Sequence, residues 1–469
     1  MIAPRWSSRA LTAIVLCAAG ACVTAGPTRP SATPVVVGVA QIDITPEQSI
    51  RLTGYGSRST PSERVAGQLR AKALAFGGPR ERPAVLITAD LIGVPRYMTD
   101  VVAGRLRRAG VDPDQLAISA THTHTGPSLS KVLPFIFNTP MSADQQRVVD
   151  RYSADLVDKL ERVALAALAD RRPSRAEWAS GSAGFAANRR VIKDGKWAGF
   201  GVTPDGAVDR DLPVLAVRGA DGSLRALLVN YACHATTLEG KENFVHGDWP
   251  AAAQALIEER HPGAVALVAI GTGADSNPNP RGGGLPDVDR HAREVADEVD
   301  RLLKGTMKAI GAPPRGRLRS IALPLAPIPS RADWEAQAKQ KGPAGFFARS
   351  ILDRIDRGEQ IATSAQYPVQ TWTFGSDLAM VFLGGEVVAD YGLRLKRELD
   401  STRLWVNAYS NDVAFYVASK RLIPEGGYEV AGSMIYYGQP SRLGDETEDL
   451  IVRTVRELLP AGFRTRGGT

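Results

Sequence analysis

Two histidines stand two residues apart directly after an apolar run. Residues 116–120 have the composition of a buried strand, and His122 and His124 follow before the turn signal Gly126-Pro127. Side chains two apart in extended backbone point to the same side, so both imidazoles can face one cavity at the strand's end. The chain has only six histidines. A pair this close indicates a metal or acid–base site; the alternative is two surface histidines in a polar loop.

A third histidine and a glutamate also follow apolar segments. His234 ends the strand predicted over residues 224–234, and Cys233, which points the other way, is interpreted as a small core residue. Glu386 follows a buried strand and two glycines, where we expect it to begin a helix whose dipole favours a carboxylate. The alternatives are a hydrogen-bonded core histidine and a helix cap. Two histidines and a glutamate are typical ligands of a catalytic zinc ion, whereas a harder cation would need more carboxylates.

The loop of residues 271–287 is the other segment of unusual composition. It contains Asp275 and Ser276 but no G-x-S-x-G nucleophile motif, and no Lys-Ser/Thr helix start follows that would complete a phosphate-binding loop. Ser276 is therefore a weak candidate for a hydrolase nucleophile and could equally be a turn hydroxyl. Asp275 is interpreted as a turn residue, and Asp248 as the cap of a helix.

Strands and helices alternate along the chain, with hairpins inserted. This order predicts an α/β protein in which helices flank a mixed β-sheet core, as one large domain over residues 35–469. The predicted strands cover residues 35–45, 69–76, 84–89, 116–120, 212–218, 224–234, 264–270, 315–326, 369–374, 378–383 and 404–409. The predicted helices cover residues 98–109, 142–169, 249–260, 288–303, 331–357 in pieces broken at Gly342-Pro343, 386–399 and 444–459. Residues 186–190 lie in a segment without a clear period.

The N-terminal residues have the features of a secretory leader. Arg5 and Arg9 precede a short apolar stretch. The small residues before Cys22 also resemble a bacterial lipoprotein signal, in which this cysteine is lipidated. We therefore expect a signal over residues 1–22 and a Pro/Ser/Thr-rich tether over residues 23–34. The expected location is secreted or in the cell envelope, either periplasmic or lipid-anchored through Cys22.

The composition is that of a globular protein, with 44% hydrophobic and 23% charged residues. Its formal net charge of +7 suits peripheral contact with anionic lipid, but no Lys/Arg run is long enough to indicate nucleic-acid binding. Cys233 is the one cysteine certain to lie in the folded body, so no internal disulfide is expected there. The sequence does not indicate an oligomeric state.

Several separated motifs resemble, in the same order, the catalytic domain of neutral ceramidases. The resemblance covers roughly residues 36–438, and its most specific parts are the histidine motif and the spacing from Tyr416 to Tyr428. The motifs that match are the run from Ala120 to Pro127, Asn188-Arg189, His234, the run from Gly273 to Ser276, Gly385-Glu386, the run from Asn407 to Tyr409, and Tyr428-Glu429.

This resemblance implies a zinc amidohydrolase that cleaves the N-acyl amide bond of ceramide or a related acylated lipid and releases a fatty acid. By position, the zinc would be held by His122, His234, Glu386 and Tyr416. His124 would lie beside the metal and protonate the departing amine after zinc-bound hydroxide attacks the carbonyl. The groups that contact the scissile amide or the attacking water would be Arg189, Tyr428 and Ser276.

Three departures from the family pattern leave the substrate open. Asn277-Pro278 stands where the family has Ser-Pro-Asn, and residues 417–420 replace a run that contains Thr-Thr; both touch substrate-facing loops. The family also carries a C-terminal β-sandwich, whereas this sequence ends at Thr469 after one helix. The alternative functions are a zinc hydrolase of a non-lipid amide or ester, a non-catalytic, metal-free binding protein of the cell envelope, and a serine hydrolase that uses Ser276.

Overall fold

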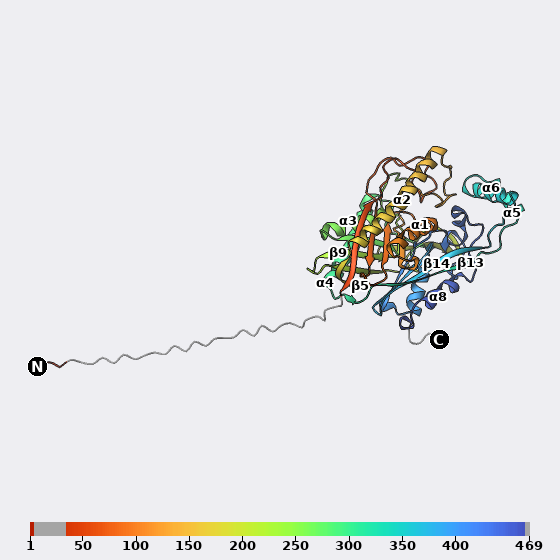
Figure 1. Cartoon of the computed structure of the whole chain (residues 1–469). Coiled ribbons are helices and arrows are strands. Elements are labelled where there is room, and N and C mark those ends of the chain that lie inside the picture. The colour runs from red at the N-terminus through yellow and green to blue at the C-terminus, as the bar shows by residue number, and fades with distance from the viewer. Residues whose placement is uncertain (4–33, 465–469) are drawn as a thin grey trace. The chain divides into compact units, whose positions relative to one another are not determined.

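Two β-sheets pack face to face in the folded body, and helices cover their outer faces (Figure 1). The structure, a computed structural model, describes residues 1–3 and 34–464. Apart from a few terminal residues, the predicted signal and tether, with Cys22, lie outside the described residues. The predicted class, an α/β fold with a mixed sheet flanked by helices, is confirmed.

The larger sheet has nine strands in the order β10-β9-β8-β5-β1-β2-β3-β4, with β12 paired to β5. The neighbours β3/β4 and β9/β10 are parallel, and each of these two pairs is joined through a helix, α1 (Arg96–Leu106) or α3 (Asp248–Arg260). The strands are β1 (Val35–Asp43), β2 (Arg70–Phe76), β3 (Ala84–Ala89), β4 (Leu116–Ala120), β5 (Arg172–Ser182), β8 (Asp211–Arg218), β9 (Leu224–Tyr231), β10 (Val265–Ile270) and β12 (Lys308–Ile310).

The second sheet has four strands in the order β13-β14-β15-β17. These are β13 (Arg315–Pro324), β14 (Ser364–Phe374), β15 (Leu378–Leu383) and β17 (Leu404–Asn407). Its inner face meets the larger sheet through buried aromatic and aliphatic side chains; the rings of Phe76 and Phe374, for example, have centroids 5.5 Å apart. Because both faces of most strands are covered, these strands read as continuous apolar runs in the sequence.

Helices cover the outer faces in two groups (Figure 1). On the larger sheet, α1 and α2 (Ala143–Ala169) cover β1 to β4, and α3 and α4 (Leu285–Lys304) cover the other half. The second sheet is covered by α7 (Ala389–Glu398) and α8 (Thr447–Leu458). The start of α2 is fixed by a capping box, in which the Ser142 hydroxyl accepts from the Gln145 amide.

A pair of short helices forms a separate cluster at the upper right of Figure 1. α5 (Arg331–Ala338) and α6 (Pro343–Asp356) enclose Trp334, Phe347 and Ile351. The predicted interruption at Gly342-Pro343 is confirmed, because α6 begins at that proline.

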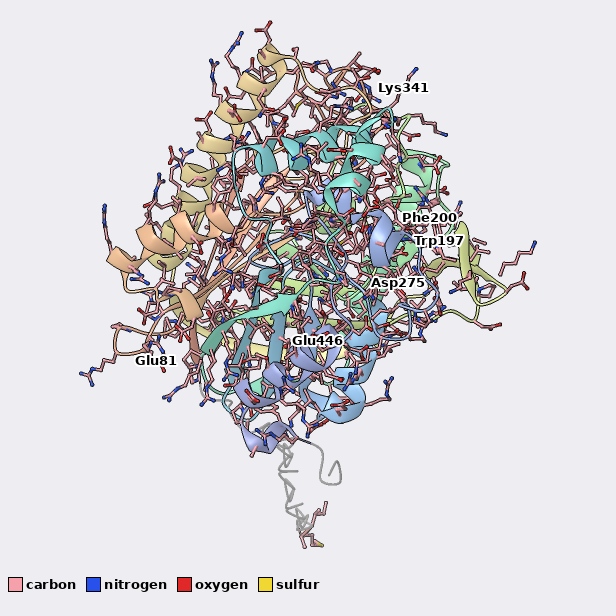
Figure 2. The ribbon with its side chains drawn as sticks, turned by 90° about the vertical axis from the view of Figure 1, so that its right-hand side faces the viewer. Glu81, Trp197, Phe200, Asp275, Lys341 and Glu446 are labelled. Atoms are coloured by element: carbon pink, nitrogen blue, oxygen red, sulfur yellow. The ribbon has the colours of Figure 1, made fainter. Side chains whose placement is uncertain are left out.

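The segment without a clear period is a β-hairpin. It consists of β6 (Ala186–Lys193) and β7 (Lys196–Thr203), with the short β11 (Ser276–Pro278) paired to β6. Asp194 and Gly195 join the strands with φ angles of 52° and 72°, and two positive φ values are what a tight type I′ hairpin turn requires. Figure 2 marks Trp197 and Phe200 of this hairpin.

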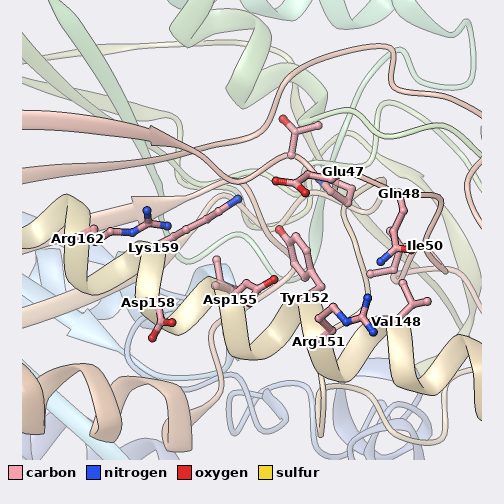
Figure 3. Close-up of a pocket in the computed structure, with 13 residues that line it drawn as sticks. Glu47, Gln48, Ile50, Val148, Arg151, Tyr152, Asp155, Asp158, Lys159 and Arg162 are labelled. Carbon is pink, nitrogen blue, oxygen red and sulfur yellow. The ribbon is translucent and has the colours of Figure 1, made fainter.

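A cavity of about 330 Å³ lies between α2 and the loop after β1 (Figure 3). Tyr152 points into this region, and its hydroxyl donates to the Ile44 carbonyl over 2.6 Å. No residue predicted to act in a site lines this cavity. None of the described helices combines the length and the apolar composition that crossing a bilayer requires.

Candidate metal centre

The carboxyl ends of strands from both sheets meet at one place. β4 leads into His122, β9 leads into His234, and β15 leads through two glycines into Glu386. The segment after β17 holds these ends together, since the Ala408 amide donates to the Ile270 carbonyl and the Asn411 amide donates to the Ile118 carbonyl. Strand ends of an α/β protein thus bring together side chains that are far apart in sequence.

Three imidazoles form the centre of this site. The ring of His122 lies 4.8 Å from that of His124 and 4.7 Å from that of His234, measured between centroids. One ring nitrogen from each of the three lies within 4.8 Å of the other two. His122 and His234 are fully buried, whereas His124 is partly exposed. The structure therefore gathers His124 into the same group as the two predicted ligands.

Each imidazole is oriented by a backbone carbonyl. The Nδ1 atoms of His122, His124 and His234 lie 2.6, 3.1 and 3.0 Å from the carbonyl oxygens of Ile92, Gly54 and Gly273. A carbonyl oxygen can only accept, so each Nδ1 carries the proton of the neutral ring. Each Nε2 then presents a lone pair to the centre of the group. Such backing hydrogen bonds are usual behind metal-ligating histidines.

Glu386 directs one carboxylate oxygen at these lone pairs. Its Oε2 lies 3.0 Å from Nε2 of His122 and 3.1 Å from Nε2 of His234, and it has no hydrogen-bond donor among the described residues. Nε2 of His124 is 3.1 Å from Nε2 of His122. Ligands at the usual 2.0–2.1 Å from a tetrahedral zinc ion are roughly 3.3 Å apart. Acceptors crowded at this spacing fit a divalent cation.

Tyr416 and Arg189 close the side of the group next to His234. The Tyr416 hydroxyl lies 3.3 Å from Nε2 of His234 and accepts from Nη2 of Arg189 over 3.1 Å. Nη1 of Arg189 is also 3.3 Å from the same Nε2. Arg189 is in turn fixed by the buried carboxylate of Glu429, which accepts from its Nε over 2.8 Å. A positive charge is thus held permanently beside the imidazoles.

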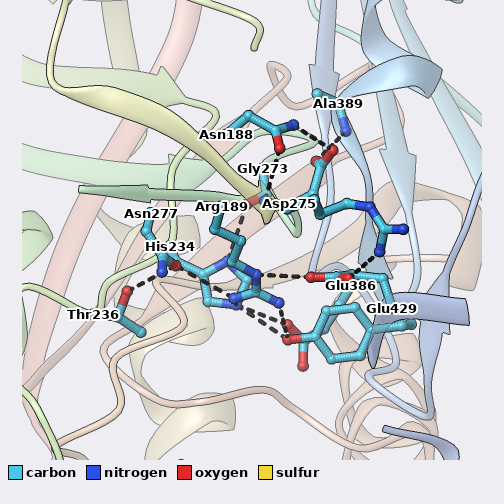
Figure 4. A network of polar contacts seen from close by, with 12 residues as sticks. Asn188, Arg189, His234, Thr236, Gly273, Asp275, Asn277, Glu386, Ala389 and Glu429 are labelled. Atoms are coloured by element: carbon cyan, nitrogen blue, oxygen red, sulfur yellow. Dashed lines mark hydrogen bonds and ion pairs between the residues drawn. The ribbon is translucent and has the colours of Figure 1, made fainter. Parts of the chain in front are cut away.

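A polar network supports Arg189 and His234 from behind (Figure 4). Asp275 accepts from the Ala389 amide over 2.8 Å and from the Asn188 side chain over 3.1 Å, and its carbonyl accepts from the Arg189 amide over 2.8 Å. The buried carboxylate therefore joins β6, the loop after β10 and the start of α7. Asp275, which was interpreted as a turn residue, is an internal link between three elements.

Ser276 and Tyr428 lie at different depths beside this network. Ser276 is fully buried, and its hydroxyl has no hydrogen-bond partner among the described side chains and backbone groups. No imidazole therefore activates it in the way that a serine hydrolase requires. Tyr428 is half-buried, and its ring centroid lies 5.3 Å from that of Tyr416 and 5.6 Å from the guanidinium carbon of Arg189.

The electrostatic surroundings keep the imidazoles of His124 and His234 neutral and the arginine charged. Burial, and next the charge of Arg189, lower the pKa of His234 to about 4. Burial also lowers the pKa of His124 well below its ordinary value, with a further contribution from His122. Burial alone would lower the pKa of Arg189, but the neighbouring Tyr416 and Glu429 together raise it well above the ordinary value. Neutral imidazoles are the form that binds a cation.

The sequence did not indicate that Tyr437 belongs to this site. Its hydroxyl donates to Oε1 of Glu386, the oxygen that does not face the imidazoles. Tyr437 lies in the 3₁₀ turn Met434–Tyr437, which follows the single helical turn Tyr428–Gly432. A tyrosine nine residues beyond the predicted site tyrosine Tyr428 carries no recognisable spacing signal, so only the fold reveals the contact.

Two local expectations are wrong. Glu386 does not begin a helix; it lies in the short strand β16 (Glu386–Val387), paired with β18 (Tyr416–Val417), and α7 starts at Ala389. This pairing places Glu386 directly opposite Tyr416. Asp248 was expected to precede α3 and cap it, but Gly247 occupies that N-cap position. Asp248 is the first residue of α3, and its carboxylate accepts from the amides that follow His234, including that of Leu238 over 2.9 Å.

Two solved structures share the fold of this chain. One is described as neutral ceramidase from Pseudomonas aeruginosa, with a TM-score of 0.69 and 18% identity; the match covers 93% of this chain and 77% of that one. The other is described as a ceramidase complexed with C2, with a TM-score of 0.67, 18% identity and the same coverage. No protein-family model and no curated protein sequence matches the chain.

Proposed function

We propose that this protein, which has the fold of neutral ceramidase, is a zinc-dependent amidohydrolase that cleaves the N-acyl amide bond of ceramide or a related acylated lipid. The observation that carries the proposal is the approach of Oε2 of Glu386 to within 3.0 and 3.1 Å of two imidazole nitrogens that present lone pairs. Acceptors so close together need a cation between them. The fold likeness and the sequence motifs support the amide substrate.

His122, His234 and Glu386 would hold the zinc ion, and the Tyr416 hydroxyl, 3.3 Å from Nε2 of His234, would supply the fourth protein atom. When bound, a zinc ion lowers the pKa of a coordinated water toward neutrality and polarises a carbonyl group. Two imidazoles, one carboxylate and one phenol suit zinc better than magnesium or calcium, which prefer oxygen ligands throughout.

His124 is placed to move the proton. Because its Nδ1 proton is held by the Gly54 carbonyl, Nε2 carries a lone pair that can accept a proton from the attacking water. The water oxygen then bonds to the amide carbon, and Nε2 of His124 returns the proton to the departing nitrogen as the C–N bond breaks. One water is consumed, and a fatty acid and an amine are formed.

Arg189 and Tyr428 would stabilise the negative charge that develops on the carbonyl oxygen. Arg189 keeps its charge, and the Glu429 carboxylate fixes its orientation before substrate binds. Such preorganised donors typically contribute about a hundredfold or more in rate each. Ser276 has a buried hydroxyl without an internal partner, so we assign it a contact with the amide of the bound substrate.

The leader-like residues 1–22 support the location that we propose for this activity. A secreted or envelope-anchored hydrolase would meet acylated lipids outside the cytoplasm.

The proposal is tested by metal analysis together with a substrate panel. We expect about one zinc per purified chain and release of fatty acid from ceramide or another N-acyl lipid, lost on chelation and restored by zinc. His122→Ala should remove both the metal and the hydrolysis. His261→Ala is the matched control, because this imidazole pairs with Asp300 on the surface and should retain both.

Each alternative predicts a different result. If the protein hydrolyses short, non-lipid amides or esters but no N-acyl lipid, it would be a zinc hydrolase with a non-lipid substrate. Zinc without turnover of any member of the panel would favour a binding protein. Activity that resists chelation but is abolished by Ser276→Ala would establish a serine hydrolase and contradict the proposal.

A further inference from the structure

Exposed apolar side chains concentrate on the hairpin formed by β6 and β7. Between residues 34 and 464, seven large apolar side chains are substantially exposed, and three of them belong to this hairpin: Ile192 (39%), Phe200 (51%) and Val202 (55%). Single exposed apolar residues are ordinary, but a cluster on one projecting element marks an interaction surface.

The tip of the same hairpin carries basic side chains. Lys193 and Lys196 are paired across the tight turn at Asp194-Gly195, and both are exposed. The Lys193 ammonium makes no hydrogen bond or ion pair with any other described residue, while the Lys196 ammonium donates to the Pro424 carbonyl over 2.8 Å. Lysines flanking exposed aliphatic and aromatic side chains are typical of elements that rest at a lipid–water boundary.

The hairpin is continuous with the candidate metal centre. The ring centroid of Phe200 lies 5.0 Å from the guanidinium carbon of Arg189 and 5.1 Å from the ring centroid of Tyr428. One phenylalanine thus faces solvent on one side and touches two proposed substrate-binding groups on the other.

Trp197 fixes the hairpin to the segment that carries Tyr428. The Trp197 amide donates to the Glu425 carbonyl over 3.0 Å, and a methyl group on Gly427 would lie only 2.3 Å from the Trp197 ring. Trp197 also packs against Phe200, at 5.5 Å between centroids, and Figure 2 shows the two labelled side by side. The hairpin and its exposed apolar side chains are therefore held at a fixed place beside Tyr428.

We propose that this hairpin docks the protein on the surface of a bilayer that contains anionic lipid. Ile192, Phe200 and Val202 would enter the boundary between headgroups and acyl chains, and Lys193 and Lys196 would contact headgroup phosphates. The choice of a lipid surface as partner rests on the proposed function, on the two lysines at the tip, which outnumber the single carboxylate of Asp194, and on the direct contact of Phe200 with Arg189. Docking there would place the substrate's bilayer next to the metal centre.

Vesicle flotation tests the docking directly. The probes are vesicles of phosphatidylcholine alone and vesicles of equal parts phosphatidylcholine and phosphatidylglycerol. Ile192→Ser with Val202→Ser should weaken binding to both by about tenfold or more, because two apolar side chains are no longer buried. Lys193→Glu should weaken binding to the anionic vesicles alone, by about fivefold or more. Leu165→Ser with Leu318→Ser is the matched control, since these side chains are equally exposed (41% and 40%) but lie on α2 and β13.

Turnover separates this inference from the proposed function. The Ile192→Ser/Val202→Ser variant should hydrolyse an N-acyl lipid in vesicles more slowly by the factor that it loses in binding, and a soluble short-chain N-acyl amide at the wild-type rate. If the wild type and the variants show the expected flotation but the wild type cleaves neither substrate, the docking inference would stand and the proposed function would be wrong. Unchanged flotation of the variant would overturn the docking inference. So would gel filtration that shows a wild-type dimer and a monomeric Ile192→Ser/Val202→Ser variant.

Discussion

Tyr437 determines which oxygen of Glu386 faces the histidines. Its hydroxyl donates to Oε1, so Oε2 remains without a donor and is turned toward His122 and His234. A carboxylate that rotates freely presents either oxygen, whereas a carboxylate held on one side is already oriented for a metal. Groups that orient metal ligands in this way commonly contribute ten- to a hundredfold in metal affinity, on the order of 1–3 kcal/mol.

Removal of this hydroxyl should therefore weaken the metal site without unfolding the protein. We expect Tyr437→Phe to lower zinc affinity by about ten- to a hundredfold, measured by competition with a chromogenic chelator. Tyr436→Phe is the control, because this neighbouring half-buried tyrosine contacts Tyr428 and not Glu386. Equal zinc affinity in the wild type and in Tyr437→Phe would show that the contact does not orient the carboxylate.

The residues of the candidate centre differ in how well the sequence could indicate them. His122, His124 and His234 follow apolar strands, and that position alone predicted that they meet in one pocket, as they do in the structure. Arg189, Tyr416 and Tyr428 were indicated only by the family resemblance. Tyr437 was missed because its approach to Glu386 depends on a turn whose geometry has no sequence signature.

At the level of secondary-structure elements, the turn at Gly54 supports the loop that carries His124. The Gly54 carbonyl accepts from Nδ1 of His124, and its φ angle of +92° belongs to the region that glycine alone adopts freely. A methyl group at this position would also lie 2.7 Å from three atoms of the His124 side chain. The turn and the imidazole therefore cannot keep their places if Gly54 gains a side chain.

Gly54→Ala should displace His124 while the strands remain folded. Misplacing a catalytic group by about 1 Å can cost on the order of a hundredfold in rate, so we expect a loss of that size in amide hydrolysis. The circular dichroism spectrum should stay that of the wild type. Gly104→Ala in α1 is the control, because a methyl group there meets nothing within 4 Å and alanine favours the helix. Wild-type hydrolysis by Gly54→Ala would mean that the position of His124 does not matter.

The apolar strands were the most predictable elements, and the β6–β7 hairpin was the least. Strands β3 and β15, buried on both faces, have the predicted bounds of residues 84–89 and 378–383. The β6–β7 hairpin was missed because its register shifts twice and β7 contains Gly199 and Gly201, so no alternation appears. Its turn signal, Asp194-Gly195, was present in the sequence and could have been used.

At the level of the whole molecule, Asp275 couples folding to pH. Burial, which outweighs the hydrogen bond from the Ala389 amide, raises the pKa of Asp275 to about 6. The unfolded chain releases this proton near pH 4, so between about pH 4 and 6 only the folded protein retains it. The contribution of Asp275 to stability is therefore present at low pH and decreases as the pH rises through this window.

The free energy of unfolding should show this dependence in urea titrations. From pH 4 to pH 7 we expect Asp275 to lower it by on the order of 3 kcal/mol, because each unit of pKa shift corresponds to about 1.4 kcal/mol. Asp275→Asn should remove this part of the pH profile. Asp205→Asn, on an exposed turn, should leave the profile unchanged. A profile that Asp275→Asn does not alter would place the pH dependence elsewhere.

The fold class was predictable from the sequence, but the arrangement of the sheets was not. Alternating strands and helices correctly predicted a mixed sheet covered by helices. The division into two facing sheets depends on pairings between distant segments, such as β5 with β1 and β8. β5 was also missed because arginine, serine and glutamate make it polar on one face.

The proposed ligands His122 and Glu386 are supplied by different sheets, and Glu386 takes its place through the pairing of β16 with β18. A nascent chain that stops short of Tyr416 lacks part of the proposed ligand set, so the zinc binding that we propose would have to follow synthesis of most of the chain. A polypeptide truncated before Tyr416 would then lack the proposed zinc site and, with it, the proposed hydrolysis.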